Sequence, residues 1–207
     1  KVIGSHWTWS VHMQQLAAEE KVEAYVLPQG VMTQLVREAA AKRPGLFTKT
    51  GIGTFVDPRI EGGRLNRSAK DILSEIVQIE GEEYIHYKRV RPDVAIFRAS
   101  AADEKGNVVF TEEGLITEAL SQAVKNNGGV VLCQVKKIVP ADTVRPYNVI
   151  VPAVLIDGII VDPDQRMSMK TEVDPYMAGN AVGERGACQP MLQDNRKVMA
   201  KRAAAEL

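Results

Sequence analysis

The residues of this chain that could do chemistry gather in GIGTFVDPRIEGG, residues 51–63, which we call the glycine loop. It combines a cluster of glycines with one Asp-Pro-Arg sequence. Glycine costs backbone entropy on folding, so such a cluster indicates a tight turn or a close approach of the backbone to another group. Its backbone N–H groups could face an anion or a carbonyl oxygen. A surface Ω-loop stiffened by Pro58 is the purely structural alternative.

The glycine loop does not match the common nucleotide-binding motifs. It lacks the third glycine of the dinucleotide-binding fingerprint and the lysine of the phosphate-binding loop. The sequence therefore gives little support to a nucleotide site, and these motifs do not identify the role of the loop.

Other reactive side chains form no catalytic or metal-binding spacing. His6 lies beside Trp7, where a base, a stacking site or a packed histidine at a strand end all fit, and the packed histidine is the commonest case. His12 and His86 are isolated, so the histidines form no metal-ligand pattern. Ser5 lacks the context of a nucleophile elbow. We expect no metal site, and nothing in the sequence favours a Ser-His-Asp triad.

Composition excludes several classes of function. The chain has 26 basic and 26 acidic residues, so it lacks the cationic character of a nucleic-acid-binding protein. The longest apolar run, residues 149–161, is broken by proline, aspartate and glycine, so we expect no membrane span. Cys133 and Cys188 have no redox or metal spacing, and Cys133 lies in an apolar run typical of a buried thiol. We expect a reducing compartment, the cytoplasm.

Helical patterns alternate with apolar, β-branched runs along most of the chain. The expected helices are residues 12–20, 31–42, 68–79 (with Ser68 and Asp71 as a capping pair) and 114–129. The expected strands are residues 1–4, 22–28, 82–89, 92–100 and 130–139, with a turn at 105–107 before a short strand. This alternation predicts an α/β fold with an open, mostly parallel sheet and helices on both faces. Ligands bind such sheets beyond the carboxyl ends of the strands.

The pattern changes near residue 164. Residues 164–190 are polar and rich in glycine and proline, which predicts a linker. We expect residues 1–163 to form one domain and residues 191–207 to form the first helix of a second domain. The chain opens inside a strand-like segment and closes on strong helix formers, so we expect it to be a piece of a longer polypeptide.

Several stretches together resemble the family I coenzyme A transferases, in the acetate/propionate and 3-oxoacid branch whose two halves are fused. They are SHWTWS to GGRLN (5–66), RPDVAIFRASAADEKGN (91–107), NNGGVVLCQVKKIV (126–139) and VDPDQ (161–165). The resemblance covers nearly the whole chain in order, and the combination of PQGV, GIGTFVDPR and GG is its most specific part. It implies the CoA-transferase (NagB–RpiA-like) fold and an amino-terminal half without its first strands.

The resemblance also implies an activity. Such enzymes move coenzyme A from an acyl-CoA donor to a free short-chain carboxylic acid. A glutamate attacks the donor thioester, and a mixed anhydride and then an enzyme glutamyl-CoA thioester follow. A carboxylate is a poor nucleophile, so the site must orient it and stabilise the developing oxyanion with fixed donors. The CoA thioester is a substrate, and no tightly bound cofactor is expected.

Site residues follow from the same resemblance, because the glycine loop faces the cleft between the two halves in that family. The expected pocket wall is Gly53, Thr54, Phe55 and Val56, with Gln29 and Gly30 at the cleft edge. Phe55 would limit acyl length, and backbone groups at Gly53 and Thr54 would meet polar atoms. The expected loop scaffold is Asp57, Pro58 and Arg59.

The family's nucleophile is absent. It lies in a VE-x-G-x-x-GG type of segment, and neither Glu61 nor Glu184 has that context. We expect the catalytic glutamate outside this chain, an isolated chain without turnover, a second CoA-transferase domain as partner, and self-association. Two alternatives stay open: a non-catalytic effector-binding or assembly module of the same fold, and a sugar-phosphate isomerase. The isomerase would need phosphate-binding loops and an acid–base pair that are not visible.

Overall fold

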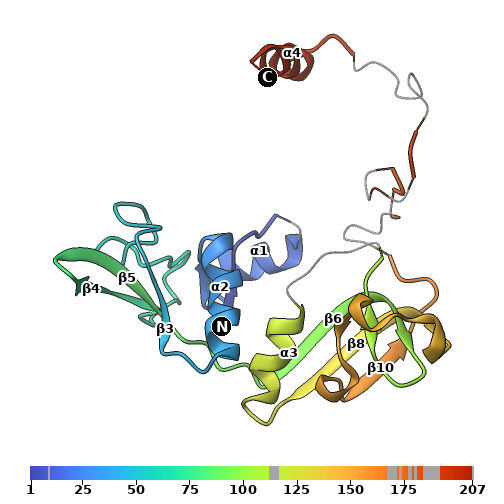
Figure 1. The fold of residues 1–207 in the computed structure, drawn as a ribbon. Helices are drawn as coiled ribbons and strands as arrows, with labels where there is room; N and C mark the ends of the chain where they lie inside the picture. Colours follow the sequence, from blue (N-terminus) through green and yellow to red (C-terminus); the bar gives the residue numbers. More distant parts are fainter. Residues whose placement is uncertain are drawn as a thin grey trace. The chain divides into compact units, whose positions relative to one another are not determined.

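The computed structural model describes residues 1–8, 10–111, 117–166, 172, 174–176, 179, 181–183 and 192–206 (Figure 1). The chain divides into two compact units, Lys1–Glu172 and Val173–Leu207. The second unit contains α4 (Asn195–Ala205), whose first turn is capped by the Asp194 carboxylate accepting the Lys197 N–H at 2.9 Å. Most of the expected linker, residues 164–190, lies outside the described residues, so the division into domains stays a prediction.

The described residues of the first unit form three sheets together with helices. A parallel pair consists of β1 (Val2–Gly4) and β2 (Ala24–Val26). An antiparallel sheet has the order β3-β5-β4, and a five-stranded sheet has the order β10-β8-β6-β7-β9. The α/β class is confirmed, while the strands are distributed over separate sheets in a way that the sequence pattern does not reveal.

The five-stranded sheet has a parallel half and an antiparallel half. Its parallel strands are β6 (Val94–Asp103), β8 (Val130–Val139) and β10 (Gly158–Val161). The short strands β7 (Val108–Val109) and β9 (Val149–Val151) extend it antiparallel beyond β6. Strand β8 is rich in Val and Ile, which pack well on a pleated surface, and β6 pairs with it through a run that is mostly Ala, Val, Ile and Phe.

One face of this sheet carries a hydrophobic core. Alternate residues of β6 and β8, namely Ala95, Phe97 and Ala99 with Val131, Cys133 and Val135, are buried. Helix α3 (Thr117–Lys125) contacts both strands and contributes Val124 to the same core. The buried thiol expected for Cys133 is confirmed, while Cys188 lies outside the described residues.

The turn between β6 and β7 is built as the sequence predicts. The Asp103 carboxylate accepts the N–H groups of Lys105 at 2.9 Å and Asn107 at 2.8 Å, and also the Asn107 side-chain amide at 2.8 Å. Gly106 takes a φ of +89°, which glycine adopts without the penalty of a Cβ. A structural turn therefore accounts for these residues.

The helix expected over residues 68–79 is wrong. Residues 74–79 form β4 (Ser74–Ile79), which pairs antiparallel with β5 (Glu82–Lys88). A two-residue turn with positive φ at Glu80 and Gly81 joins them, as a type I′ hairpin requires. The Ser68 side chain caps no helix and instead donates to the Glu20 carboxylate at 2.6 Å. Cross-strand pairing of apolar β-branched residues outweighed a helical pattern of similar length.

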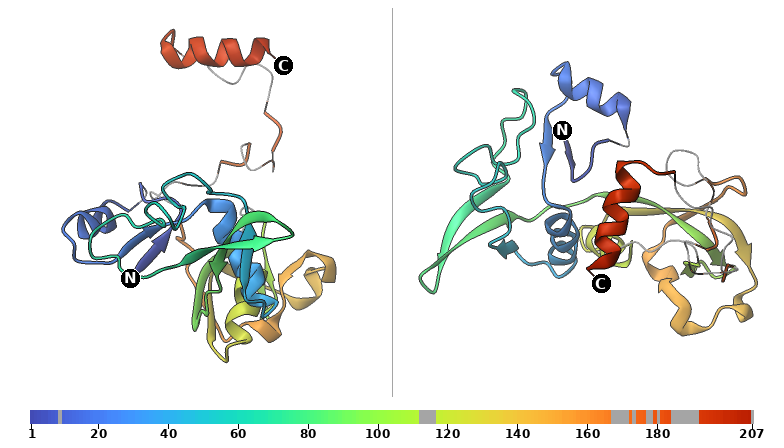
Figure 2. Two further views of the ribbon diagram at one scale, coloured as in Figure 1. Left: turned by 90° about the vertical axis from the view of Figure 1, so that its left-hand side faces the viewer. Right: turned by 90° about the horizontal axis from the view of Figure 1, so that it is seen from above.

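Helices α1 (Val11–Ala18) and α2 (Gln29–Ala40) follow β1 and β2. Helix α2 buries one stripe, Val31, Leu35 and Ala39, and packs against α3 and β3 (Gly45–Thr48). The β4–β5 hairpin projects away from α2 and α3 (Figures 1 and 2). Short 3₁₀ turns cover Ala141–Thr143, Pro146–Asn148 and Ala153–Leu155. Among the described helices, none has the length and apolar character needed to cross a membrane.

Candidate functional site

Two glycines allow the glycine loop to lie directly against two sheets. At Gly51, with φ of +103°, a Cβ would lie 2.6 Å from the Tyr87 hydroxyl and 2.6 Å from Val56 Cγ2. At Gly63, with φ of +76°, a Cβ would lie 2.3 Å from the Val26 carbonyl oxygen. The Val26 N–H also donates to the Gly63 carbonyl at 2.7 Å. These two positions therefore serve close packing of the chain on itself.

A buried aspartate holds the glycine loop in one conformation. Asp57 is 1% exposed, and its carboxylate accepts the N–H groups of Gly53 at 2.9 Å and Arg59 at 3.0 Å. The Arg59 guanidinium donates to the same carboxylate at 3.0 and 2.8 Å, and reaches Glu83 on β5 at 3.0 Å. These hydrogen bonds, those from Arg59 above all, hold the pKa of Asp57 well below its usual range although burial opposes them.

The surface of the loop differs from the expected pocket wall in two respects. Val56 is 2% exposed and lies against Gly51, so its side chain belongs to the interior and not to a wall. The N–H groups of Gly53 and Thr54 donate within the loop, to Asp57 Oδ2 at 2.9 Å and to the Gly51 carbonyl at 3.1 Å. Neither N–H is free for a ligand, because the tight loop uses its own donors. Phe55 remains outward, 48% exposed.

The carboxyl ends of β1 and β2 bring two chemically useful segments together. Because Gly4 pairs with Val26 in parallel register, the residues that follow both strands lie side by side. The Ser5 hydroxyl donates to the Gln29 side-chain oxygen. Parallel strands offer ligand sites at this edge. The glycine loop is anchored to the same end of β2, so it borders the edge where Gln29 lies.

Helix α2 begins at this edge without a side-chain cap. Its N-cap residue is Pro28, which has no side-chain donor or acceptor, and no cap hydrogen bond is formed. The first N–H groups of a helix have no partner within the helix, and the helix dipole makes that end electropositive. Gln29 and Gly30 are both exposed there. The edge therefore offers donors to an oxygen-rich ligand.

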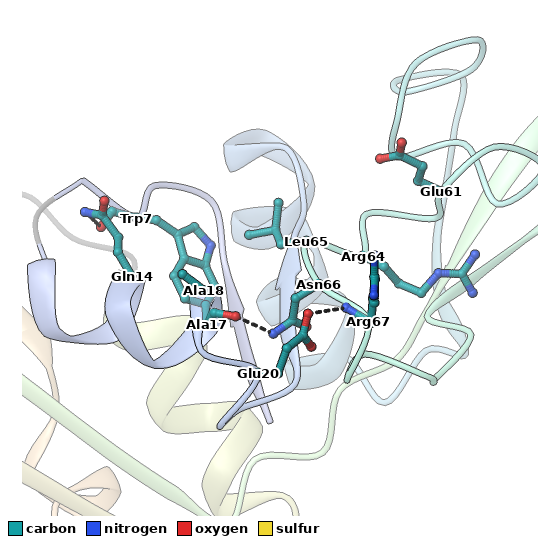
Figure 3. Close-up of a pocket in the computed structure, with 10 residues that line it drawn as sticks. All are labelled: Trp7, Gln14, Ala17, Ala18, Glu20, Glu61, Arg64, Leu65, Asn66 and Arg67. Carbon is teal, nitrogen blue, oxygen red and sulfur yellow. Dashed lines mark hydrogen bonds between the residues drawn. The ribbon is translucent and has the colours of Figure 1, made fainter.

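A cavity of about 640 Å³ lies next to the loop (Figure 3). Its lining consists of Trp7, Gln14, Ala17, Ala18, Glu20, Glu61, Arg64, Leu65, Asn66 and Arg67. The Asn66 amide fixes one side by donating to the carbonyls of Ala17 at 2.8 Å and Val22 at 2.7 Å. Two arginines and two glutamates cancel in charge, so the cavity does not select an anion.

Sequence reasoning missed two parts of this region. The cavity joins Trp7 to residues 61–67, and the link between Ser5 and Gln29 joins the ends of two strands. Both contacts depend on the pairing of β1 with β2. These strands are too short for a sequence pattern to predict their pairing. His6 contacts the Thr8 hydroxyl at 2.5 Å at an exposed position. Across the described ranges, no group of His, Cys, Asp and Glu could hold a metal ion.

Comparison with known proteins gives the family. The family model described as coenzyme A transferase matches residues 1–162. A caffeate CoA-transferase from Acetobacterium woodii is 45% identical over 200 residues, which cover 94% of this chain and 38% of that protein. The acetate CoA-transferase YdiF of Escherichia coli K12 is 40% identical over 205 residues, covering 98% and 39%. The chain thus spans about two-fifths of the length of these curated relatives.

Solved structures of coenzyme A transferases resemble this chain in fold. The crystal structure of the acyl-CoA transferase YdiF apoenzyme from Escherichia coli O157:H7 superimposes with a TM-score of 0.87 at 39% identity, covering 99% of this chain and 39% of that one. The structure of a YdiF thioester complex with CoA superimposes with a TM-score of 0.85. Glutaconate coenzyme A-transferase from Acidaminococcus fermentans has 16% sequence identity and a TM-score of 0.62, so it shares the fold. The chain belongs to the coenzyme A transferase family.

Proposed function

We propose that this chain supplies one wall of the active-site cleft of an acyl-CoA:carboxylate coenzyme A transferase. A glutamate carboxylate attacks the acyl thioester, forms a mixed anhydride and releases the CoA thiolate. The thiolate then attacks the glutamyl carbonyl, which gives the glutamyl-CoA thioester and frees the donor's acyl group as a carboxylate. An acceptor acid takes the coenzyme A by the reverse sequence. The relative YdiF, whose solved structures include a thioester complex with CoA, supports this chemistry.

The observation that carries the proposal is the edge at the carboxyl ends of β1 and β2. Gln29, Gly30 and the uncapped start of α2 gather donors there, and the glycine loop lies alongside. Each step of the transfer develops negative charge on a carbonyl oxygen, and fixed donors stabilise that charge. The loop is held rigidly by Asp57 and Arg59, so it keeps its position without reorganising during the reaction.

The nucleophile in this proposal belongs to the second CoA-transferase domain, outside residues 1–207. Glu20 is a poor candidate for the nucleophile within this chain. Its carboxylate accepts hydrogen bonds from Ser68 and from the Arg67 N–H, and these bonds lower its pKa. Glu61 is exposed in the glycine loop, and no buried strand leads into it. The Glu61 side chain is therefore solvated by water, and no hydrogen bond that would orient its carboxylate for attack is found in the described part of the chain.

Phe55 is the proposed limit on acyl and acid length. Its ring is the aromatic side chain that the loop exposes, next to the aliphatic Ile60, whereas Val56 is buried. A short-chain donor and acceptor would fit beneath such a ring. We further propose a cytoplasmic, self-associating enzyme in which this chain and the second domain face each other across the cleft.

The test uses the full-length polypeptide that contains this chain. Incubated with acetyl-CoA and propionate, it should form propionyl-CoA at about 1 per second or faster. The 1–207 chain alone should form none. Glu61→Gln in the full-length polypeptide should keep the wild-type rate. Turnover by the isolated chain, or its loss in Glu61→Gln, would place the nucleophile within these residues and reject the proposal.

A further inference from the structure

The contact between Ser5 and Gln29 fixes which end of an exposed amide is available. The Ser5 hydroxyl donates to Gln29 Oε1, so the oxygen end of that amide is held at Ser5. Across the described residues, no hydrogen bond is found for the Gln29 side-chain –NH₂ group. An amide oxygen has two lone pairs and the amide nitrogen has two donor hydrogens, so this contact takes one lone pair and leaves both –NH₂ donors available.

Strand pairing makes the contact possible. Gly4 and Val26 are partners in the parallel pair, and the Leu27 N–H donates to the Gly4 carbonyl at 3.0 Å. This bond holds the chain after β1 against the chain after β2, which brings Ser5 to the first residue of α2. Ser5 is half-buried, whereas Gln29 is exposed. A long exposed glutamine otherwise samples many rotamers, so an anchored one has lost that freedom before a ligand arrives.

We propose that Ser5 is a positioning residue that locks the Gln29 amide with its –NH₂ group toward the cleft, ready to donate to a carboxylate or thioester carbonyl oxygen. The inference deepens the proposed function and rests on it. Ligands that present an oxygen acceptor to this –NH₂ group are favoured over ligands that present a hydroxyl or ammonium donor. The contact lies at the protein surface, so its loss acts on ligand orientation more than on folding.

Kinetics of the full-length enzyme test the role through coupling. Ser5→Ala should lower kcat/KM for the acceptor acid about fivefold, the value of one neutral hydrogen bond. Ser5→Thr keeps a hydroxyl and should recover most of that loss. Ser10→Ala is the matched control, because it removes the same group from the same segment and no hydrogen bond of that hydroxyl is found in the described part of the chain. It should leave kcat/KM unchanged.

The decisive comparison is the double variant. Ser5→Ala should have no further effect in a Gln29→Ala background, because Ser5 acts only through that amide. An equal loss in both backgrounds, or a Ser5→Ala variant indistinguishable from Ser10→Ala, would overturn the assignment. Crystal structures of the wild-type and Ser5→Ala enzymes give a readout independent of activity. Gln29 should lie within hydrogen-bond distance of Ser5 in the first and leave that position in the second. A wild-type enzyme without transfer activity would reject the proposed function, whereas an unchanged Gln29 would reject this inference alone.

Discussion

Replacement of Asp57 by asparagine tests whether one buried carboxylate holds the glycine loop. The asparagine is nearly the same size, yet it has no charge and places an –NH₂ group where one carboxylate oxygen accepted hydrogen bonds. The carboxylate accepts from Gly53, from the Arg59 N–H and twice from the Arg59 guanidinium. Hydrogen bonds to charged groups contribute about 1.5–3 kcal/mol each, and asparagine retains one acceptor oxygen.

The net cost is smaller than the sum of these bonds. The Arg59 side chain is 48% exposed and keeps Glu83 as a partner, so its charge is not left in a desolvated site. We expect the free energy of unfolding to fall by about 2–3 kcal/mol, measured by urea denaturation at neutral pH. The Gly53 amide should also exchange its hydrogen faster. Glu61→Gln, the same change at an exposed position of the same loop, is the control.

The pH dependence checks the cause. The folded-state pKa of Asp57 lies below its usual value, so its contribution is present above about pH 4 and is lost as the pH falls through the folded-state pKa. The stability difference between wild type and Asp57→Asn should therefore be constant from neutral pH to about pH 5 and shrink below about pH 4. A loss below about 0.5 kcal/mol at neutral pH, or a difference that grows on acidification, would refute the reasoning.

Three further predictions follow from the loop and its neighbours. Gly51→Ala should lower the unfolding free energy by about 3 kcal/mol, because its Cβ would collide with Tyr87 and Val56. Gly53→Ala should lower it by about 1 kcal/mol, because a Cβ there meets open space. Equal losses of the two variants in thermal denaturation would contradict this prediction. Phe55→Ala in the full-length enzyme should raise kcat/KM for longer acids relative to acetate while changing stability by less than about 0.5 kcal/mol, and an unchanged acid preference would remove Phe55 from the pocket. Burial raises the pKa of Tyr87 to about 12, so stability should fall as the pH rises from about 10 through that value. Tyr87→Phe should remove the Tyr87 part of this fall and the phenol that ionises near pH 12 in ultraviolet titration, while the part from Tyr25, whose pKa burial also raises, should persist.

Sequence patterns predicted the elements in which a regular pattern extends over many residues, and one turn with a specific local sequence. The β6 and β8 runs, the α2 stripe and the Asp103–Asn107 turn follow from local sequence. Residues 74–79 were misassigned because a short apolar run fits helix and strand equally, and only pairing with β5 decides between them. The Glu80–Gly81 turn was the available signal for a hairpin.

The candidate site was harder to predict because it depends on long-range contacts. The glycine loop could be identified from its composition, but which glycines pack and which face outward is set by Tyr87 and by Val26. The burial of Val56 follows from the same contacts. The link between Ser5 and Gln29 depends on the parallel register of two three-residue strands, which no local pattern specifies.

Peptide mapping of the coenzyme A adduct tests the central claim most directly. The full-length polypeptide is incubated with acetyl-CoA alone, so that the glutamyl-CoA thioester accumulates without an acceptor, and the modified peptide is identified by mass spectrometry. The adduct should lie on one glutamate outside residues 1–207, and it should disappear when propionate is added. An adduct on a glutamate of this chain, such as Glu20 or Glu61, would contradict the claim that these residues supply only one wall of the cleft.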